Sequence, residues 1–91
     1  MHDTQEIIEV LEYLAKQTEN IIEQEIKGTN RFLVTTLKIQ ELDEGYANVQ
    51  VLAEAANSKE EMKQIIVDWG YDLETVTPEQ VQIYDLEELR K

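Results

Sequence analysis

The apolar residues of this chain recur first at the spacing of a helix and then at the spacing of a strand. Between residues 4 and 27 they follow the i, i+3, i+4, i+7 pattern that puts one buried stripe on a helix. The stripe comprises Ile7, Ile8, Leu11, Leu14, Ala15, Ile21, Ile22 and Ile26. We therefore predict a long amphipathic helix, which Asp3 or Thr4 would cap and Gly28 would end.

The face of this predicted helix that lies opposite the apolar stripe is acidic. It carries Glu9, Glu12, Glu19 and Glu23, interrupted by Lys16. Glu12 stands four residues before Lys16, an order that favours an ion pair along a helix. Glu23 stands in the same relation to Lys27. Tyr13 also falls on this polar side. Tyrosine is enriched in binding surfaces, but single exposed apolar residues are common, and we favour this simpler interpretation.

Residues 31–42 and 46–54 predict two strands, because their side chains alternate with a period of two. One face of the first strand holds Leu33, Thr35, Leu37 and Ile39, and one face of the second holds Ala47, Val49, Val51 and Ala53. The sequence Asp43-Glu44-Gly45 between them is a turn signal, and Tyr46 follows it. We expect a half-buried antiparallel hairpin.

A second helix is predicted to begin after Ser58, with Glu61 completing a capping box. Its apolar positions are Met62, Ile65, Ile66 and Trp69, and Gly70 would close it. In the connection that follows, Tyr71 and Leu73 are expected to pack against the core.

Residues 80–86 alternate like a third strand. The alternative is a helix over 78–90 that starts at Thr77 and Pro78, but that helix would scatter Ile83 and Leu86 over different faces. We therefore favour the strand, preceded by one helical turn and followed by a short turn at the C-terminus. The prediction is a single α+β domain over residues 1–91, with α-β-β-α-β order and a mostly antiparallel three-stranded sheet packed against two helices.

The residue types that usually carry catalysis are scarce in this chain, so we expect no enzyme. With no cysteine there is no thiol nucleophile and no cysteine-ligated metal. The one histidine, His2, lies near the N-terminus, and Ser58 is explained by its capping role. The three glycines are too scattered for a phosphate loop, and the acids do not match a calcium-binding loop. We therefore expect no cofactor and no metal.

Acidic residues dominate the charge of this chain, with 20 acids against 8 bases and a net charge of −12. This surplus exceeds the magnitude of about 2–8 that keeps a small domain in solution. The two ends of the chain carry most of it, while residues 29–57 are nearly neutral. The candidate partner-binding residues are Glu9, Glu12, Glu19, Glu23, Asp68, Asp72, Glu74, Asp85, Glu87 and Glu88.

The same charge constrains the partner. Direct contact with nucleic acid or anionic lipid is not expected, because phosphates require clustered Lys and Arg. No apolar stretch is long enough to span a membrane and no secretion signal is visible, so we expect a cytoplasmic location.

In size and charge the chain is similar to small acidic proteins of phages and mobile elements that mimic DNA, including some anti-restriction and anti-CRISPR inhibitors. The similarity is one of composition, and it implies a modulator that docks on the basic surface of a nucleic-acid-binding protein. The alternative is an assembly protein that forms a homodimer through its apolar helix or a sheet edge, with the acids only solvating the surface.

Overall fold

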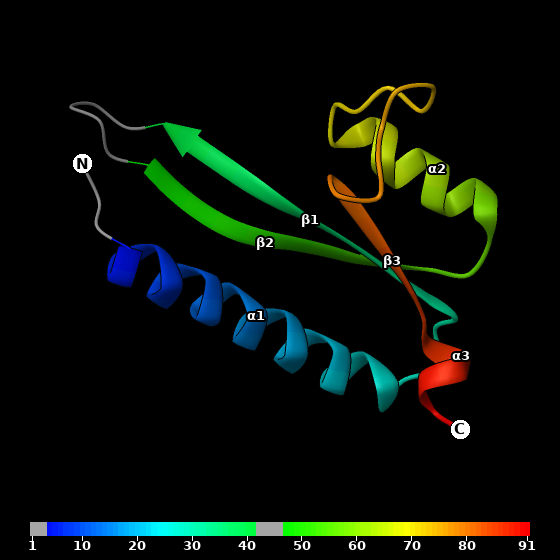
Figure 1. The fold of residues 1–91 in the computed structure, drawn as a ribbon. Helices are drawn as coiled ribbons and strands as arrows, with labels where there is room; N and C mark the ends of the chain where they lie inside the picture. The colour runs from blue at the N-terminus through cyan, green and yellow to red at the C-terminus, as the bar shows by residue number, and fades with distance from the viewer. Residues whose placement is uncertain (1–3, 42–46) are drawn as a thin grey trace.

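The computed structural model describes residues 4–41 and 47–91, and in these residues it has three helices and three strands (Figure 1). In chain order they are α1 (Thr4–Ile26), β1 (Phe32–Glu41), β2 (Ala47–Ala56), α2 (Lys59–Asp68), β3 (Val81–Asp85) and α3 (Leu86–Leu89). The predicted α+β class and element order are confirmed, with α3 as the short C-terminal turn. The predicted turn at 43–45 and Tyr46 lie outside the described residues.

The three strands form one antiparallel sheet in the order β2-β1-β3. Central strand β1 pairs with β2 along its whole length, from Phe32 opposite Ala56 to Glu41 opposite Ala47. Its pairing with β3 is much shorter and covers only residues 32–36. The outer half of β1, residues 37–41, therefore has a neighbouring strand on one side only.

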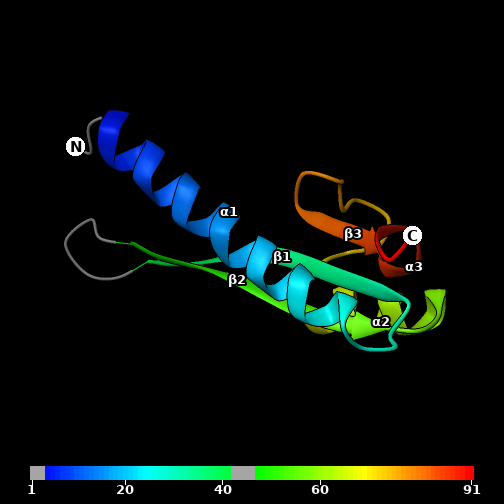
Figure 2. The ribbon, with the colours of Figure 1, turned by 90° about the horizontal axis from the view of Figure 1, so that it is seen from below.

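Helices cover both faces of the sheet (Figures 1 and 2), whereas the alternation in the hairpin predicted one covered face. On the α2 side, Val34, Ala56, Met62, Ile66 and Val81 form the buried core, with Phe32, Ile65, Trp69, Tyr71 and Val76 packed against it. On the α1 side, Leu14 is buried next to Thr35. The whole run 33–36 is consequently buried, on alternating faces of the strand.

The termini of α2 are closed largely as predicted. The Ser58 hydroxyl accepts the backbone N–H of Glu61 at 3.2 Å. The Glu61 carboxylate reaches back to the N–H of Asn57, one residue before the expected position. At the other end Gly70 adopts φ 95°, and the N–H of Tyr71 donates to the carbonyl of Ile66, as in a Schellman motif.

Two expectations about residues that follow helices need correction. Helix α1 ends just before Gly28, whose N–H donates to the Glu25 carbonyl at 3.0 Å, but Gly28 is not left-handed; Gly70 is the only described glycine with positive φ. The Arg90 guanidinium completes this helix end by donating to the carbonyls of Glu25 and Ile26 at 2.8 and 2.9 Å. Leu73 is exposed because the turn around Asp72 directs it away from the core.

The strand prediction for residues 80–86 is confirmed, with bounds Val81–Asp85. A single turn precedes it, in which the N–H groups of Gln80 and Val81 donate to the carbonyl of Thr77. The strand is favoured over a helix because it pairs with β1 and buries Val81 in the core. Asp85 then caps α3 by accepting the N–H of Glu87 at 3.0 Å.

The molecule is elongated, with extents of 42 × 29 × 18 Å and a radius of gyration of 14.8 Å. A compact chain of this length has a radius of gyration of about 12 Å. In Figure 2, α1 crosses the hairpin obliquely, so its N-terminal half extends past β1 on the side where β3 lies. The predicted burial of Ile7, Ile8 and Leu11 is therefore wrong: all three are exposed, because the first turns of α1 lie beside the hairpin and not over it.

Candidate interaction surface

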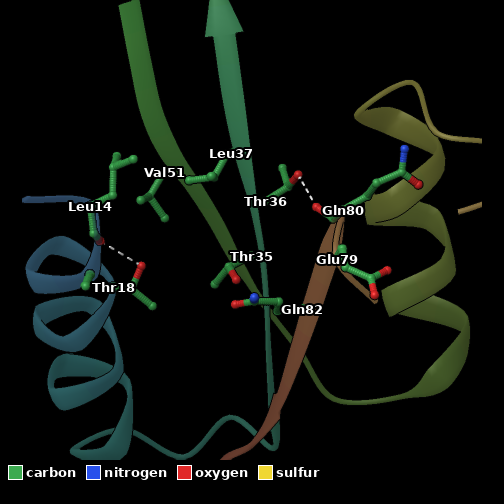
Figure 3. A pocket seen from close by; sticks show the side chains of 10 residues that line it. Leu14, Thr18, Thr35, Thr36, Leu37, Val51, Glu79, Gln80 and Gln82 are labelled. Carbon is green, nitrogen blue, oxygen red and sulfur yellow. Dashed lines mark hydrogen bonds between the residues drawn. The ribbon is translucent and has the colours of Figure 1, made fainter. Parts of the chain in front are cut away.

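The four predicted acids of α1 form one strip, which we call the acidic ridge: Glu9, Glu12, Glu19 and Glu23. All four side chains are exposed. Leu14 and Thr18 line a groove on the sheet side of α1 (Figure 3), so the ridge, on the other side of the helix, points to solvent. At 1.5 Å per residue the ridge is about 21 Å long.

Few contacts within the protein engage these acids. Gln5 approaches Glu9 at 3.5 Å. Within residues 4–41 and 47–91, the carboxylates of Glu12, Glu19 and Glu23 have no hydrogen bond and no ion pair. The two ion pairs predicted with Lys16 and Lys27 are therefore absent. The ridge carboxylates keep their charge exposed to a partner.

Tyr13 lies beside the ridge and is 60% exposed. Its hydroxyl accepts a hydrogen bond from the Gln17 amide at 2.6 Å, which holds the ring on this side of α1. An exposed aromatic ring among charged groups is the kind of side chain that contributes most to protein interfaces.

The predicted acids near α2 lie on the other face of the sheet. Asp68 is the last residue of α2 and accepts the Gln64 amide at 2.8 Å. Asp72 accepts the N–H of Glu74 at 2.9 Å, which shapes the connection before β3. These exposed acids are partly committed to local structure.

The predicted C-terminal acids have structural roles as well. Asp85 caps α3. Glu87 lies 3.8 Å from Arg31, and Glu88 lies 3.0 Å from Lys91. With Arg90 next to them, these acids belong to a mixed-charge region. The ten predicted residues thus lie in three places, and only the ridge is a dedicated acidic strip.

The structure also reveals an apolar surface, most of which the sequence pattern assigned to the core. We call it the arm: residues 7–13 of α1 and residues 37–41 of β1. Its exposed apolar side chains are Ile7, Ile8, Val10, Leu11, Leu37 and Ile39, of which Ile39 is the most exposed at 65%.

The lengths of the predicted elements could have indicated this exposed surface. The 23 residues of α1 and the 10 residues of β1 each span about 33–35 Å. The elements that could cover them, α2 with 10 residues and β3 with 5, span only about 15–17 Å. About half of the long helix and hairpin must therefore extend beyond the core.

A groove of about 170 Å³ lies where the arm meets the rest of the fold (Figure 3). Leu14 and Thr18 of α1 form one wall, Thr35 and Leu37 lie in the floor, and Glu79, Gln80 and Gln82 line the other side. Its lining brings together no nucleophile with a base. Among the described residues, no group of three or more His, Cys, Asp or Glu side chains is arranged to hold a metal ion.

Comparison with protein-family models, with curated proteins and with solved structures finds no match to this chain. Within its described residues, no helix combines the length and apolar character that a membrane span requires. Functional inference therefore depends on the chain's own surface.

Proposed function

We propose that the protein is a binding module whose acidic ridge docks on a basic surface of another protein. The observation that carries this proposal is the ridge itself, because four exposed carboxylates share one side of a helix without a structural task. Charge of one sign along a rigid element raises the rate of encounter with an oppositely charged partner by about 10–1,000-fold.

The partner we propose is a nucleic-acid-binding protein, since such proteins present clustered Lys and Arg over an extended strip. A strip of carboxylates about 21 Å long would occupy that surface in place of phosphates. The chain itself, at −12, is unsuited to bind nucleic acid or an anionic membrane. We propose a role in inhibition or modulation, without catalysis, in the cytoplasm.

Affinity capture with the tagged chain tests this function, at about 50 mM and about 500 mM salt. We expect a basic partner at low salt, and we expect that high salt releases it. Reversing the ridge with Glu9→Lys, Glu12→Lys, Glu19→Lys and Glu23→Lys should abolish capture.

The matched control reverses four exposed acids on the α2 side of the sheet: Glu54→Lys, Glu60→Lys, Asp68→Lys and Glu74→Lys. It changes the net charge by the same amount, so it should leave most of the capture intact if the ridge is the interface. Equal loss in both variants would show that only overall charge matters. Capture that ignores salt would contradict the proposal.

Self-assembly is a second candidate function, and the arm favours it. Fully burying one large aliphatic side chain contributes about 1.5–3 kcal/mol, so six half-exposed ones represent roughly 6 kcal/mol of unused burial. A homodimer that covers the arm would bury part of this surface while the acids of the ridge remain in solvent.

A further inference from the structure

The outer half of β1 is an open sheet edge. Residues 37–41 pair with β2 on one side, while β3 ends its pairing at Thr36 on the other. Unpaired backbone groups along such an edge are a template for one more strand. Natural edges are usually protected by charged side chains, lysine above all, or by a bulge. This edge carries one lysine, Lys38, on the α2 side of the sheet, whereas Leu37 and Ile39 project on the α1 side.

The N-terminal half of α1 extends over the side of the sheet where that edge is open. Figure 2 shows α1 crossing the hairpin, with its first turns beyond β1 on the side of the hairpin where β3 lies. This half of the helix carries Ile7, Ile8 and Leu11, all exposed. A strand added to the edge would lie near these side chains, so it would gain backbone hydrogen bonds and apolar contacts together.

The chain exposes more surface than a compact monomer of its mass. Its solvent-accessible surface is 7018 Å². A compact monomer of 10.6 kDa exposes about 5,500 Å². The excess of roughly 1,500 Å² is greater than the about 800 Å² that each partner buries in an interface of standard size.

We propose that this edge binds a second copy of the same chain, with the two β1 strands antiparallel about a two-fold axis at Ile39. Residue 38 of one copy then lies opposite residue 40 of the other. The two three-stranded sheets become one sheet of six strands.

The edge is self-complementary in this arrangement. Directly opposed residues of an antiparallel pair project to the same face, so Leu37 and Ile39 of both copies gather under the two α1 helices. On the other face Lys38 stands opposite the neutral Gln40 of the second copy, which avoids a like-charge pair at that position. Residues 37–41 of a second copy can therefore pair with this edge without a partner of another kind.

The dimer is an addition to the proposed function and does not depend on it. The effect of salt distinguishes the two proposals. Two chains of −12 repel each other, so salt should strengthen the dimer. Salt should weaken docking of the ridge on a basic protein. The failure of one prediction therefore leaves the other standing.

Sedimentation equilibrium of the purified full chain, at about 50 mM and about 500 mM salt, tests the dimer. We expect twice the 10.6 kDa mass of one chain, with tighter association at high salt. Ile39→Lys should raise the dissociation constant by about tenfold or more, and Leu11→Lys should raise it by a smaller factor. Val67→Lys is the matched control, because it introduces the same charge at an exposed apolar position of α2, outside the interface.

Hydrogen exchange provides the second measurement. The amides of residues 37–41 should exchange more slowly in concentrated than in dilute wild-type protein, while those of residues 32–36 should be protected in both. A single-chain mass under all conditions would overturn the proposal. So would a dimer that Ile39→Lys leaves intact, or one that dissociates as salt is raised.

Discussion

At the residue scale, the most constrained polar group is the Thr36 hydroxyl. It is buried in β1 and donates its single proton to the Gln80 carbonyl at 2.7 Å, so the Tyr71 hydroxyl must donate to it in turn, also at 2.7 Å. This short chain of hydrogen bonds joins the sheet to the connection before β3. Alternation in the strand predicted the face on which Thr36 lies, but not partners 35 and 44 residues away.

Replacing Thr36 with valine should lower the free energy of unfolding by about 1–3 kcal/mol, because two polar partners lose their hydrogen bond in a buried place. Urea unfolding measures this change. Thr35→Val is the control: Thr35 is equally buried and its side chain has no hydrogen bond among the described residues. Its effect should stay within about 0.5 kcal/mol. Equal losses in the two variants would refute the special role of Thr36.

Two glycines at helix ends provide a second test at this scale. Gly70→Ala should cost about 1–2 kcal/mol, because φ 95° is unfavourable for any residue with a Cβ, although the surrounding space is open. Gly28→Ala should be neutral or stabilising by up to about 1 kcal/mol, since its φ is ordinary and a Cβ would meet the Glu25 carbonyl at 3.5 Å. Thermal unfolding of both variants measures this difference in stability. Equal destabilisation would contradict the assignment of the two roles.

At the scale of elements, the sequence predicts helices and strands well where periodicity is strong. The bounds of α1 and β1 agree with the expected 4–27 and 31–42 to within one residue at each end. The end of α1 could not be explained from local sequence. The N–H of Gly28 reaches the Glu25 carbonyl, but the other hydrogen bonds to the last carbonyls come from Arg90, at the far end of the chain. Only the docking of α3 beside α1 brings that guanidinium into place.

Arg90→Met should therefore loosen the end of α1. It keeps the apolar stem but removes two charged hydrogen bonds to carbonyls at the negative end of the helix, a loss of about 1–2 kcal/mol. Amides in the last turn of α1 should exchange faster with solvent. Lys91→Met removes only an exposed ion pair with Glu88, so it should change stability by less than about 1 kcal/mol. Unchanged exchange in Arg90→Met would show that the cap is dispensable.

At the scale of the whole molecule, the division of the chain into a core and an arm determines what it offers to partners. The amphipathic pattern of α1 is the same in both halves, so periodicity assigns Leu11 and Leu14 alike to the core. Leu14 is 6% exposed and Leu11 is 58% exposed. The difference arises because the sheet is wide only near the core. Periodicity shows which face is apolar, whereas the position of neighbouring elements decides whether that face is covered.

The candidate site could be predicted only in part, because periodicity gives the face of a helix but not the positions of the elements relative to one another. The ridge follows from helical spacing alone, so its position on α1 was available from the sequence. The other predicted acids were grouped only by their nearness along the chain. The fold separates them, since α2 and α3 lie at different places around the sheet (Figure 1). Asp85 in particular has a capping role that charge counting does not reveal.

Tyr13 offers a test of the interface that leaves the charge unchanged. Tyr13→Ala should weaken binding of the captured partner by about tenfold, as expected for an exposed aromatic anchor near the centre of an interface. Its effect on unfolding should be small, because the ring is 60% exposed. Leu73→Ala, on the other side of the sheet, should leave binding unchanged. Equal affinity of wild type and Tyr13→Ala would place the interface elsewhere.

The central claim is that the acidic ridge is the binding surface. Its most direct test is the affinity of the purified chain for the captured basic partner, measured from about 50 mM to about 500 mM salt. We predict that wild-type affinity falls by about tenfold or more over this range. The ridge-reversed variant should bind weakly throughout, while the variant reversed on the α2 side should follow the wild type. A flat salt dependence, or undiminished binding by the ridge-reversed variant, would contradict the claim.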